Sequence, residues 1–349
     1  MPNQDELKPF RPNTLLKARK AGVIPFTDGG SGVNLNLPAV GYLSAVVLRL
    51  AGTLNLGGAG ALADLGPFNL LKTIEVFANF GGASIWKTSG FGAFIASNGF
   101  FPNFLPDAGD SRSLTANTDV YQAGVANGNN TWTLFYVLPI SLNFGINFDA
   151  GLILLQSNTV TVTVAPSFGN AAGDAVASLI GGTGFTGNLH VYYLYFEVPP
   201  RDVAQPPLLI VRTLEEIAPI VAQGENIYRV PPMGTLLQMT TVTRLNSARS
   251  DGFDYARIIY NKTETRFDME RQFLRFMNRA QGGVNLPVGC YRWDLWASYA
   301  NGVMAVGDSR DAIDTEEIAQ LEFVYNITGA LGGAGNEIRF IRRIVQILQ

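Results

Sequence analysis

The sequence predicts an all-β protein with a few short helices, built as two similar β domains in tandem. Three observations support this class. Runs of alternating apolar and polar residues dominate the chain, Gly (38) and Pro (18) are abundant, and a proline-rich segment divides the sequence into halves of similar length. Alternation with a period of two is typical of strands, and frequent glycine and proline supply the turns between them.

The composition indicates that the folded chain buries large surfaces against other subunits. Of 349 residues, 15% are charged and 47% are hydrophobic, whereas soluble domains carry roughly 25% charged residues. So few charges leave little polar material to cover an isolated chain. The formal net charge of -3 argues against a nucleic-acid-binding protein, and we expect no sequence-specific nucleic acid binding.

The first element is an N-terminal arm, predicted over residues 1–34. Residues 1–6 lack the apolar core of a signal peptide, so we expect synthesis in a cytoplasm. Pro9 and Pro12 delay any helix until about Asn13. The arm is either a partly ordered terminus or a segment drawn to an anionic surface, such as phospholipid head groups or packaged nucleic acid. Its candidate contact residues are Lys8, Arg11, Lys17, Arg19 and Lys20.

The first β domain is predicted over residues 35–198. Over 131–138, alternate residues place Trp132, Leu134 and Tyr136 on one face, and valine alternates with threonine over 159–164. Over 189–198 both faces are largely apolar, as expected of a strand that is covered on two sides. The segment 136–164 therefore indicates a strand, a compact crossover and a second strand.

A linker over residues 199–207 contains four prolines, which cannot lie inside a sheet. The second β domain is predicted over 208–349. Strands expected near 131, 158 and 187 repeat near 253, 288 and 317, which indicates a structural duplication. A half-buried strand is predicted over 317–328.

One amphipathic helix is predicted over residues 264–280. Phe273 and Phe276 lie on its apolar half, and Arg271 and Arg275 lie on the other half. Two interpretations stay open: the helix covers an edge of the second domain, or its basic half contacts an anionic partner.

The chain offers few residues for catalysis. His190 is the single histidine and Cys290 the single cysteine, so a multi-thiolate metal site is excluded. A loose dinucleotide-binding pattern over 58–63 is followed by Pro67, which leaves no room for the helix that would bind the pyrophosphate. The acidic run over 308–317 could bind a hard cation or supply a carboxylate pair, but a solvated loop is the simpler interpretation. We expect no catalytic, cofactor-binding or metal-binding residues.

The segment Leu138-Pro139-Ile140-Ser141-Leu142-Asn143-Phe144, followed by Ala150-Gly151-Leu152-Ile153-Leu154-Leu155-Gln156 and a valine-alternating strand, resembles double jelly-roll major capsid proteins. These belong to tailless icosahedral DNA viruses, and the phages with an internal membrane (tectivirus-like) fit this chain length best. In the second half, Leu286-Pro287-Val288-Gly289-x-Tyr291 and Ala312-Ile313-Asp314-Thr315 are similar to the end of the family's second jelly roll.

The resemblance covers about 130–200 and 285–330. It implies that each domain is an eight-stranded jelly-roll sandwich. It further implies that the chain forms homotrimers of pseudo-hexagonal outline, which assemble a virion shell with other virion proteins such as a vertex protein. The arm would lie on the inner side and contact membrane lipid or a neighbouring subunit.

Two alternatives remain open at the level of sequence. A carbohydrate-binding phage spike or receptor-binding β-sandwich protein requires Trp86, Trp132, Trp293 and Trp296 to converge on an exposed groove. A glycoside hydrolase on a jelly-roll scaffold requires two carboxylates of the 308–317 run to face each other across a cleft at about 5 to 10 Å.

Overall fold

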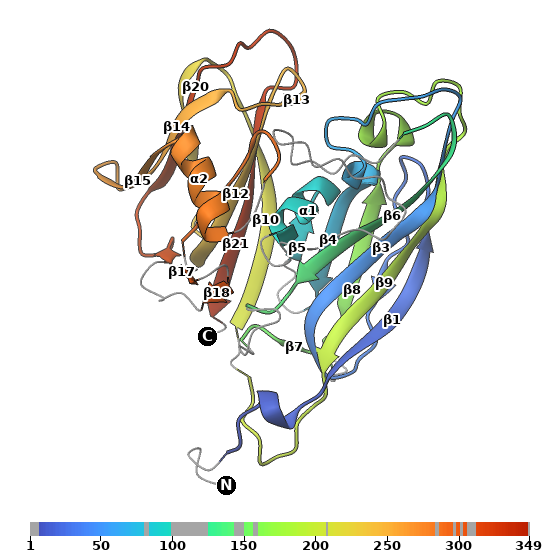
Figure 1. Cartoon of the computed structure of the whole chain (residues 1–349). Coiled ribbons are helices and arrows are strands. Elements are labelled where there is room, and N and C mark those ends of the chain that lie inside the picture. The colour runs from blue at the N-terminus through green and yellow to red at the C-terminus, as the bar shows by residue number, and fades with distance from the viewer. Residues whose placement is uncertain are drawn as a thin grey trace.

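The computed structural model describes residues 7–79, 84–98, 125–142, 150–155, 160–206, 209–282, 286–295, 298–300, 303–305 and 312–347. These residues form two β-sandwiches that lie side by side (Figure 1). The first sandwich is drawn in blue to green and the second in yellow to red. The segment before the first strand and the 199–206 linker lie together at one end of the molecule.

The first sandwich consists of two four-stranded sheets. One sheet has the order β1 (Leu16–Pro25), β9 (Gly184–Phe196), β3 (Tyr42–Leu56) and β6 (Gly128–Pro139), with β7 (Ile153–Leu154) also beside β3. The other has the order β2 (Leu35–Asn36), β8 (Val162–Phe168), β4 (Leu71–Ala78) and β5 (Ser84–Thr88). Helix α1 (Gly90–Asn98) follows β5, and short helical turns are η2 (Arg11–Asn13), η3 (Phe68–Leu70) and η4 (Ala171–Ala175).

The second sandwich repeats this arrangement. One sheet has the order β10 (Leu209–Pro219), β21 (Glu337–Ile347), β12 (Thr235–Leu245) and β16 (Cys290–Asp294). The other has the order β11 (Gly224–Arg229), β20 (Leu321–Ile327), β14 (Phe253–Tyr260) and β15 (Glu264–Glu270), and helix α2 (Arg271–Gly282) follows β15. Small additions are β13 (Ala248–Arg249) and β19 (Ile313–Asp314) beside β12, and the pair β17 (Ser298–Ala300) and β18 (Val303–Ala305).

The eight main strands of each sandwich follow the same topology. Numbered along the chain within each sandwich, the strands lie in the orders 1-8-3-6 and 2-7-4-5. A helix stands between the fifth and sixth strands in both cases. This is the eight-stranded jelly roll that the sequence resemblance implies, and the predicted fold class is confirmed.

The duplication is real, but the predicted matching of strands between the two halves is wrong. The strand at 131 was matched to the one at 253, whereas the structural counterpart of β6 is β16 and that of β14 is β4. The order of strands is conserved between the halves while the connections differ in length, so a constant offset along the chain cannot align them.

The helix predicted over 264–280 is wrong in its first half, which forms strand β15. In this strand Phe267 pairs with Ile258 and Met269 with Ala256, both on β14. Their spacing of two residues is that of a strand, and pairing with the neighbouring strand forms it. Helix α2 begins at Arg271 and keeps Leu274 in the core.

Part of the predicted N-terminal arm is also a strand. A single 3₁₀ turn, η2, ends at Asn13 and no α-helix follows it; the chain continues as β1, which pairs with β9 from Leu16 to Pro25. Backbone pairing along the edge of a sheet satisfies the N–H and C=O groups that a free arm would leave to water. The basic residues of this strand therefore occupy fixed positions in the first sandwich.

A continuous sheet joins the two sandwiches. Strand β5 of the first sandwich pairs in parallel with β10 of the second, with Trp86 opposite Thr213, and this contact links a ten-stranded sheet. Side chains reinforce the junction. Asp64 accepts hydrogen bonds from Arg244 Nε at 3.0 Å and from Arg249 Nε at 3.2 Å.

Helix α1 fills the junction from the first sandwich. Its cap residue Ser89 donates from its backbone N–H to Glu215 at 2.5 Å, and Arg249 lies 5.2 Å from the ring centroid of Phe91. Phe91 shares one buried cluster with Cys290 and Ile341, which lie on the second sandwich. The face of the β10-β21-β12-β16 sheet that points away from its own core is thus covered by the first sandwich.

Candidate functional site

The segment before β1 pairs with the proline-rich linker over 199–206. Lys8 and Val203 form a parallel bridge, and Lys8 Nζ lies 2.8 Å from a carboxylate oxygen of Asp202. The hydrogen bond to Asp202 raises the pKa of Lys8, so the ammonium stays charged at neutral pH. Lys8 and Asp202 both remain largely exposed.

Phe10 holds the segment before β1 against the first sandwich. Its ring is 6% exposed and packs edge-on against Tyr42 at 5.7 Å and Phe196 at 5.6 Å between ring centroids. An aromatic residue buried by two others contributes both apolar area and edge-to-face attraction. The sequence analysis did not single out Phe10, because nothing in its local pattern shows which distant strands it will contact.

The basic residues of β1 divide between two faces. Lys17 pairs with Tyr195 and Arg19 with Tyr193, whereas Lys20 pairs with Tyr192. Directly paired residues of an antiparallel sheet point to the same side. Tyr193 and Tyr195 belong to the core, so Lys17 and Arg19 lie on the core side at the open edge of the sandwich.

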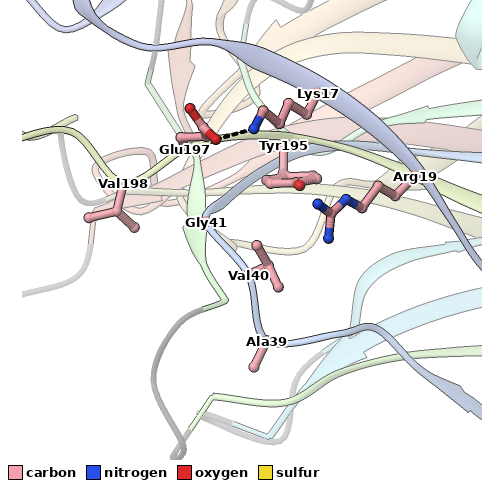
Figure 2. A pocket seen from close by; sticks show the side chains of 8 residues that line it. All are labelled: Lys17, Arg19, Ala39, Val40, Gly41, Tyr195, Glu197 and Val198. Carbon is pink, nitrogen blue, oxygen red and sulfur yellow. Dashed lines mark hydrogen bonds and ion pairs between the residues drawn. The ribbon is translucent and has the colours of Figure 1, made fainter.

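Lys17 and Arg19 line a shallow pocket of about 470 Å³ with Tyr195, Glu197 and Val40. Figure 2 shows both side chains reaching from β1 toward Tyr195, with Lys17 joined to Glu197. The Arg19 guanidinium carbon lies 5.8 Å from the ring centroid of Tyr195, within the range of a cation–π contact. The charge of Lys17 is thus offset by Glu197 of the same chain, whereas Arg19 contacts an aromatic ring.

Lys20 lies on the opposite, outer face of the β1-β9-β3-β6 sheet. On this face Val23 pairs with His190, which pairs in turn with Arg49. The described strand residues of the face include Lys20, His190 and Arg49 and no carboxylate. We name it the outer basic face; its members are Leu16, Ala18, Lys20, Val23, Val47, Arg49, Phe135, His190, Tyr192 and Leu194.

Two polar atoms of the outer basic face lack hydrogen-bond partners within the described residues. They are Arg49 Nε and His190 Nδ1, both shielded from solvent. Burial lowers the pKa of His190, and the positive charges of Lys20 and Arg49 lower it further. The imidazole is therefore neutral at pH 7. Buried polar atoms in folded proteins almost always have a hydrogen-bond partner. These two nitrogens therefore leave hydrogen-bonding capacity unused on the outer basic face.

The five sequence-predicted arm residues therefore do not form one cluster. Lys8 lies at the linker, Lys17 and Arg19 at the pocket, and Lys20 on the outer basic face. Arg11 begins η2, and its side chain lies outside the described residues.

The residues required by the alternatives lie elsewhere. Trp86, Trp132 and Trp293 are 1%, 2% and 3% exposed and belong to the cores, while Trp296 lies outside the described residues. Of the 308–317 run, 308–311 fall outside them as well; Glu316 donates its backbone N–H to Asp314 at 3.0 Å, which is a turn contact. Among the described residues no group of three or more His, Cys, Asp or Glu side chains is placed to hold a metal ion.

Solved structures share this architecture. The major capsid protein of STIV, the Sulfolobus turreted icosahedral virus, superposes with a TM-score of 0.67 at 11% identity, covering 95% of this chain and 96% of that chain. The PBCV-1 virus capsid gives a TM-score of 0.64 at 12% identity, covering 95% and 94%. The major capsid protein P2 of bacteriophage PM2 gives 0.55 at 11% identity, covering 96% and 98%.

No protein-family model matches the chain, and no curated protein matches it. The structural likeness spans both sandwiches and shows that the chain has the double jelly-roll fold of viral major capsid proteins. Across the described part of the chain, no helix combines the length and apolar character that a membrane crossing requires.

Proposed function

We propose that the chain is the structural major capsid protein of an icosahedral virion. In this proposal three copies form a capsomer of pseudo-hexagonal outline, and capsomers assemble the shell without any catalytic step. The observation that carries it is the superposition on viral capsid proteins over about 95% of both chains at a TM-score of 0.67.

The chemistry of the chain supports the same function. Only 15% of the residues are charged, and apolar side chains of the outer basic face, among them Val23, Tyr192 and Leu194, stay partly exposed in the single chain. A protein that works as a subunit of a larger shell covers such surfaces with its neighbours. The carbohydrate-binding alternative is not supported, because the three described tryptophans are core residues.

The N-terminal segment would face the interior of the virion, and its partner there is anionic membrane lipid. Lys8 is exposed and charged, and Phe10 and the linker hold it at one end of the molecule. An arm pinned at its base can present cations to phosphate head groups. A vertex protein and the capsid lattice complete the proposed partners.

Charge removal tests the arm. Changing Lys8, Arg11, Lys17, Arg19 and Lys20 to Gln should weaken cosedimentation with anionic vesicles or reduce particle assembly. Each Lys or Arg near an anionic surface contributes about 1 kcal/mol of attraction. A control variant with Lys72, Arg229 and Lys262 changed to Gln removes exposed basic residues from other surfaces. If the five-residue variant behaves as the wild type in both assays, the arm has no such role.

The native mass of the purified chain tests the function as a whole. Light scattering after gel filtration should give three times the 37.7 kDa of one chain. A stable monomer at all concentrations would count against a shell protein.

A further inference from the structure

The internal junction between the two sandwiches indicates which surfaces of separate copies meet. Within one chain, the fifth strand of the first sandwich pairs with the first strand of the second, as β5 with β10. Helix α1 then covers the outer face of the second sandwich's sheet. Each sandwich carries the same two surfaces, because both have the same topology.

The corresponding surfaces at the two outer ends of the chain are open. Strand β15, the fifth strand of the second sandwich, pairs only with β14 among the described residues. Strand β1, the first strand of the first sandwich, pairs only with β9 among the same residues. Unpaired strand edges are ready-made sites for pairing with another chain.

Helix α2 is exposed where its counterpart α1 is covered. Phe91 on α1 is 2% exposed, whereas Phe273 and Phe276 on α2 are 51% and 60% exposed. Their rings lie 6.3 Å apart and form one apolar patch. On α1 this position faces the neighbouring sandwich, so on α2 the patch lacks the sandwich that would cover it.

The open surfaces carry opposite charges. Strand β15 presents three exposed carboxylates and one arginine, Arg266; Glu264 and Glu270 are exposed, and Asp268 is paired with Arg257 on β14 at 3.2 Å. Strand β1 presents Arg19 and Lys20 besides Lys17, which is paired with Glu197. The outer basic face beside it holds Arg49 Nε and His190 Nδ1, which have no hydrogen-bond partner among the described residues. Complementary charge of this kind favours one mode of docking and disfavours like-with-like contact.

We propose that β15 and α2 of one copy dock onto β1 and the outer basic face of a second copy. The contact repeats the β5–β10 and α1 junction between molecules, with Phe273 and Phe276 covering the apolar side chains around Tyr192. The contact is head-to-tail, and the proposed function sets the ring that it closes at three copies. The inference rests on the proposed function and names the surfaces through which that trimer forms.

The proposed docking also explains why strand β9 carries apolar residues on its outer face. Over 189–198 its sequence is largely apolar on both faces, as in a strand covered on two sides, yet Tyr192 and Leu194 are only half-buried in the single chain. A second copy seated on the outer basic face supplies the missing cover.

Charge reversal in the full-length chain tests the contact. Lys20 and Glu270 are both exposed. We expect Lys20→Glu alone, or Glu270→Lys alone, to raise the concentration for half-dissociation of the trimer by about tenfold or more, since like charges then oppose each other. Combining Lys20→Glu with Glu270→Lys should restore the wild-type value. Sedimentation at low salt gives the measurement, because screening shortens the reach of these charges.

The apolar patch is tested by a matched pair of variants. Phe273→Ser with Phe276→Ser should dissociate the trimer, whereas Val221→Ser with Ile227→Ser should leave it intact, although these control side chains are 81% and 59% exposed. Circular dichroism confirms that each variant is folded. A wild-type monomer would overturn the proposed function itself. A wild-type trimer that survives the reversals and the phenylalanine changes would overturn only this interface.

Discussion

Cys290 shows how completely the junction between the sandwiches is closed. Its thiol is 1% exposed and lies in the cluster shared with Phe91 and Ile341. Burial raises the pKa of the thiol to about 12. Because the thiolate is the reactive species, a thiol held neutral and shielded is inert.

We therefore expect Cys290 in the native protein to resist an aromatic disulfide reagent at pH 8. One equivalent should react promptly once urea unfolds the chain, and the single cysteine makes the signal unambiguous. Rapid stoichiometric labelling in buffer would show that the two sandwiches separate readily.

At the same scale, the sequence indicated side-chain direction better than side-chain partners. Trp132, Leu134 and Tyr136 were predicted on one face of a strand and are buried there. The role of Arg49 could not be predicted, because the alternation of a strand shows that a residue faces outward and not what lies opposite it. His190, the single histidine, lies within β9.

Among the elements, the contact of the loop before η3 with β12 and β13 governs the coupling of the two sandwiches. Asp64 accepts hydrogen bonds from Arg244 and Arg249, all of them largely buried. Removing the carboxylate leaves two guanidinium groups without their shared acceptor in a place that water reaches poorly.

Asp64→Ala should lower the free energy of unfolding by about 2 to 4 kcal/mol. Urea denaturation followed by tryptophan fluorescence gives the value, and a broadened or biphasic transition would indicate that the sandwiches unfold separately. Asp202→Ala is the control, because its partner Lys8 and Asp202 itself are 61% and 58% exposed, and exposed ion pairs contribute little. Equal stability of the two variants would contradict a junction held by Asp64.

Element boundaries were predicted less well than element types. The strands over 131–138 and 189–198 appear as β6 and β9. The helix over 264–280 was half wrong, because Phe267 and Met269 lie two residues apart, which is the strand period, and both pair with β14. The β1 strand was missed, since its charged sequence shows little alternation and its stability comes from pairing with β9.

For the whole molecule, composition and order along the chain were sufficient to predict the class of fold. A low charge content, a proline-rich linker and repeated strand patterns indicated two β-sandwiches, and the structure has the double jelly-roll topology. The correspondence between the halves could not be predicted, because connection lengths differ. Neither could the outer basic face, which exists only when β1, β9, β3 and β6 are assembled.

The central claim is that this chain builds a shell from closed rings of three copies. Light scattering after gel filtration, over a hundredfold range of loading concentration, tests it most directly. The account predicts a constant mass of three times 37.7 kDa. A mass equal to one chain throughout, or a mass that grows without limit as open chains of subunits would, contradicts it.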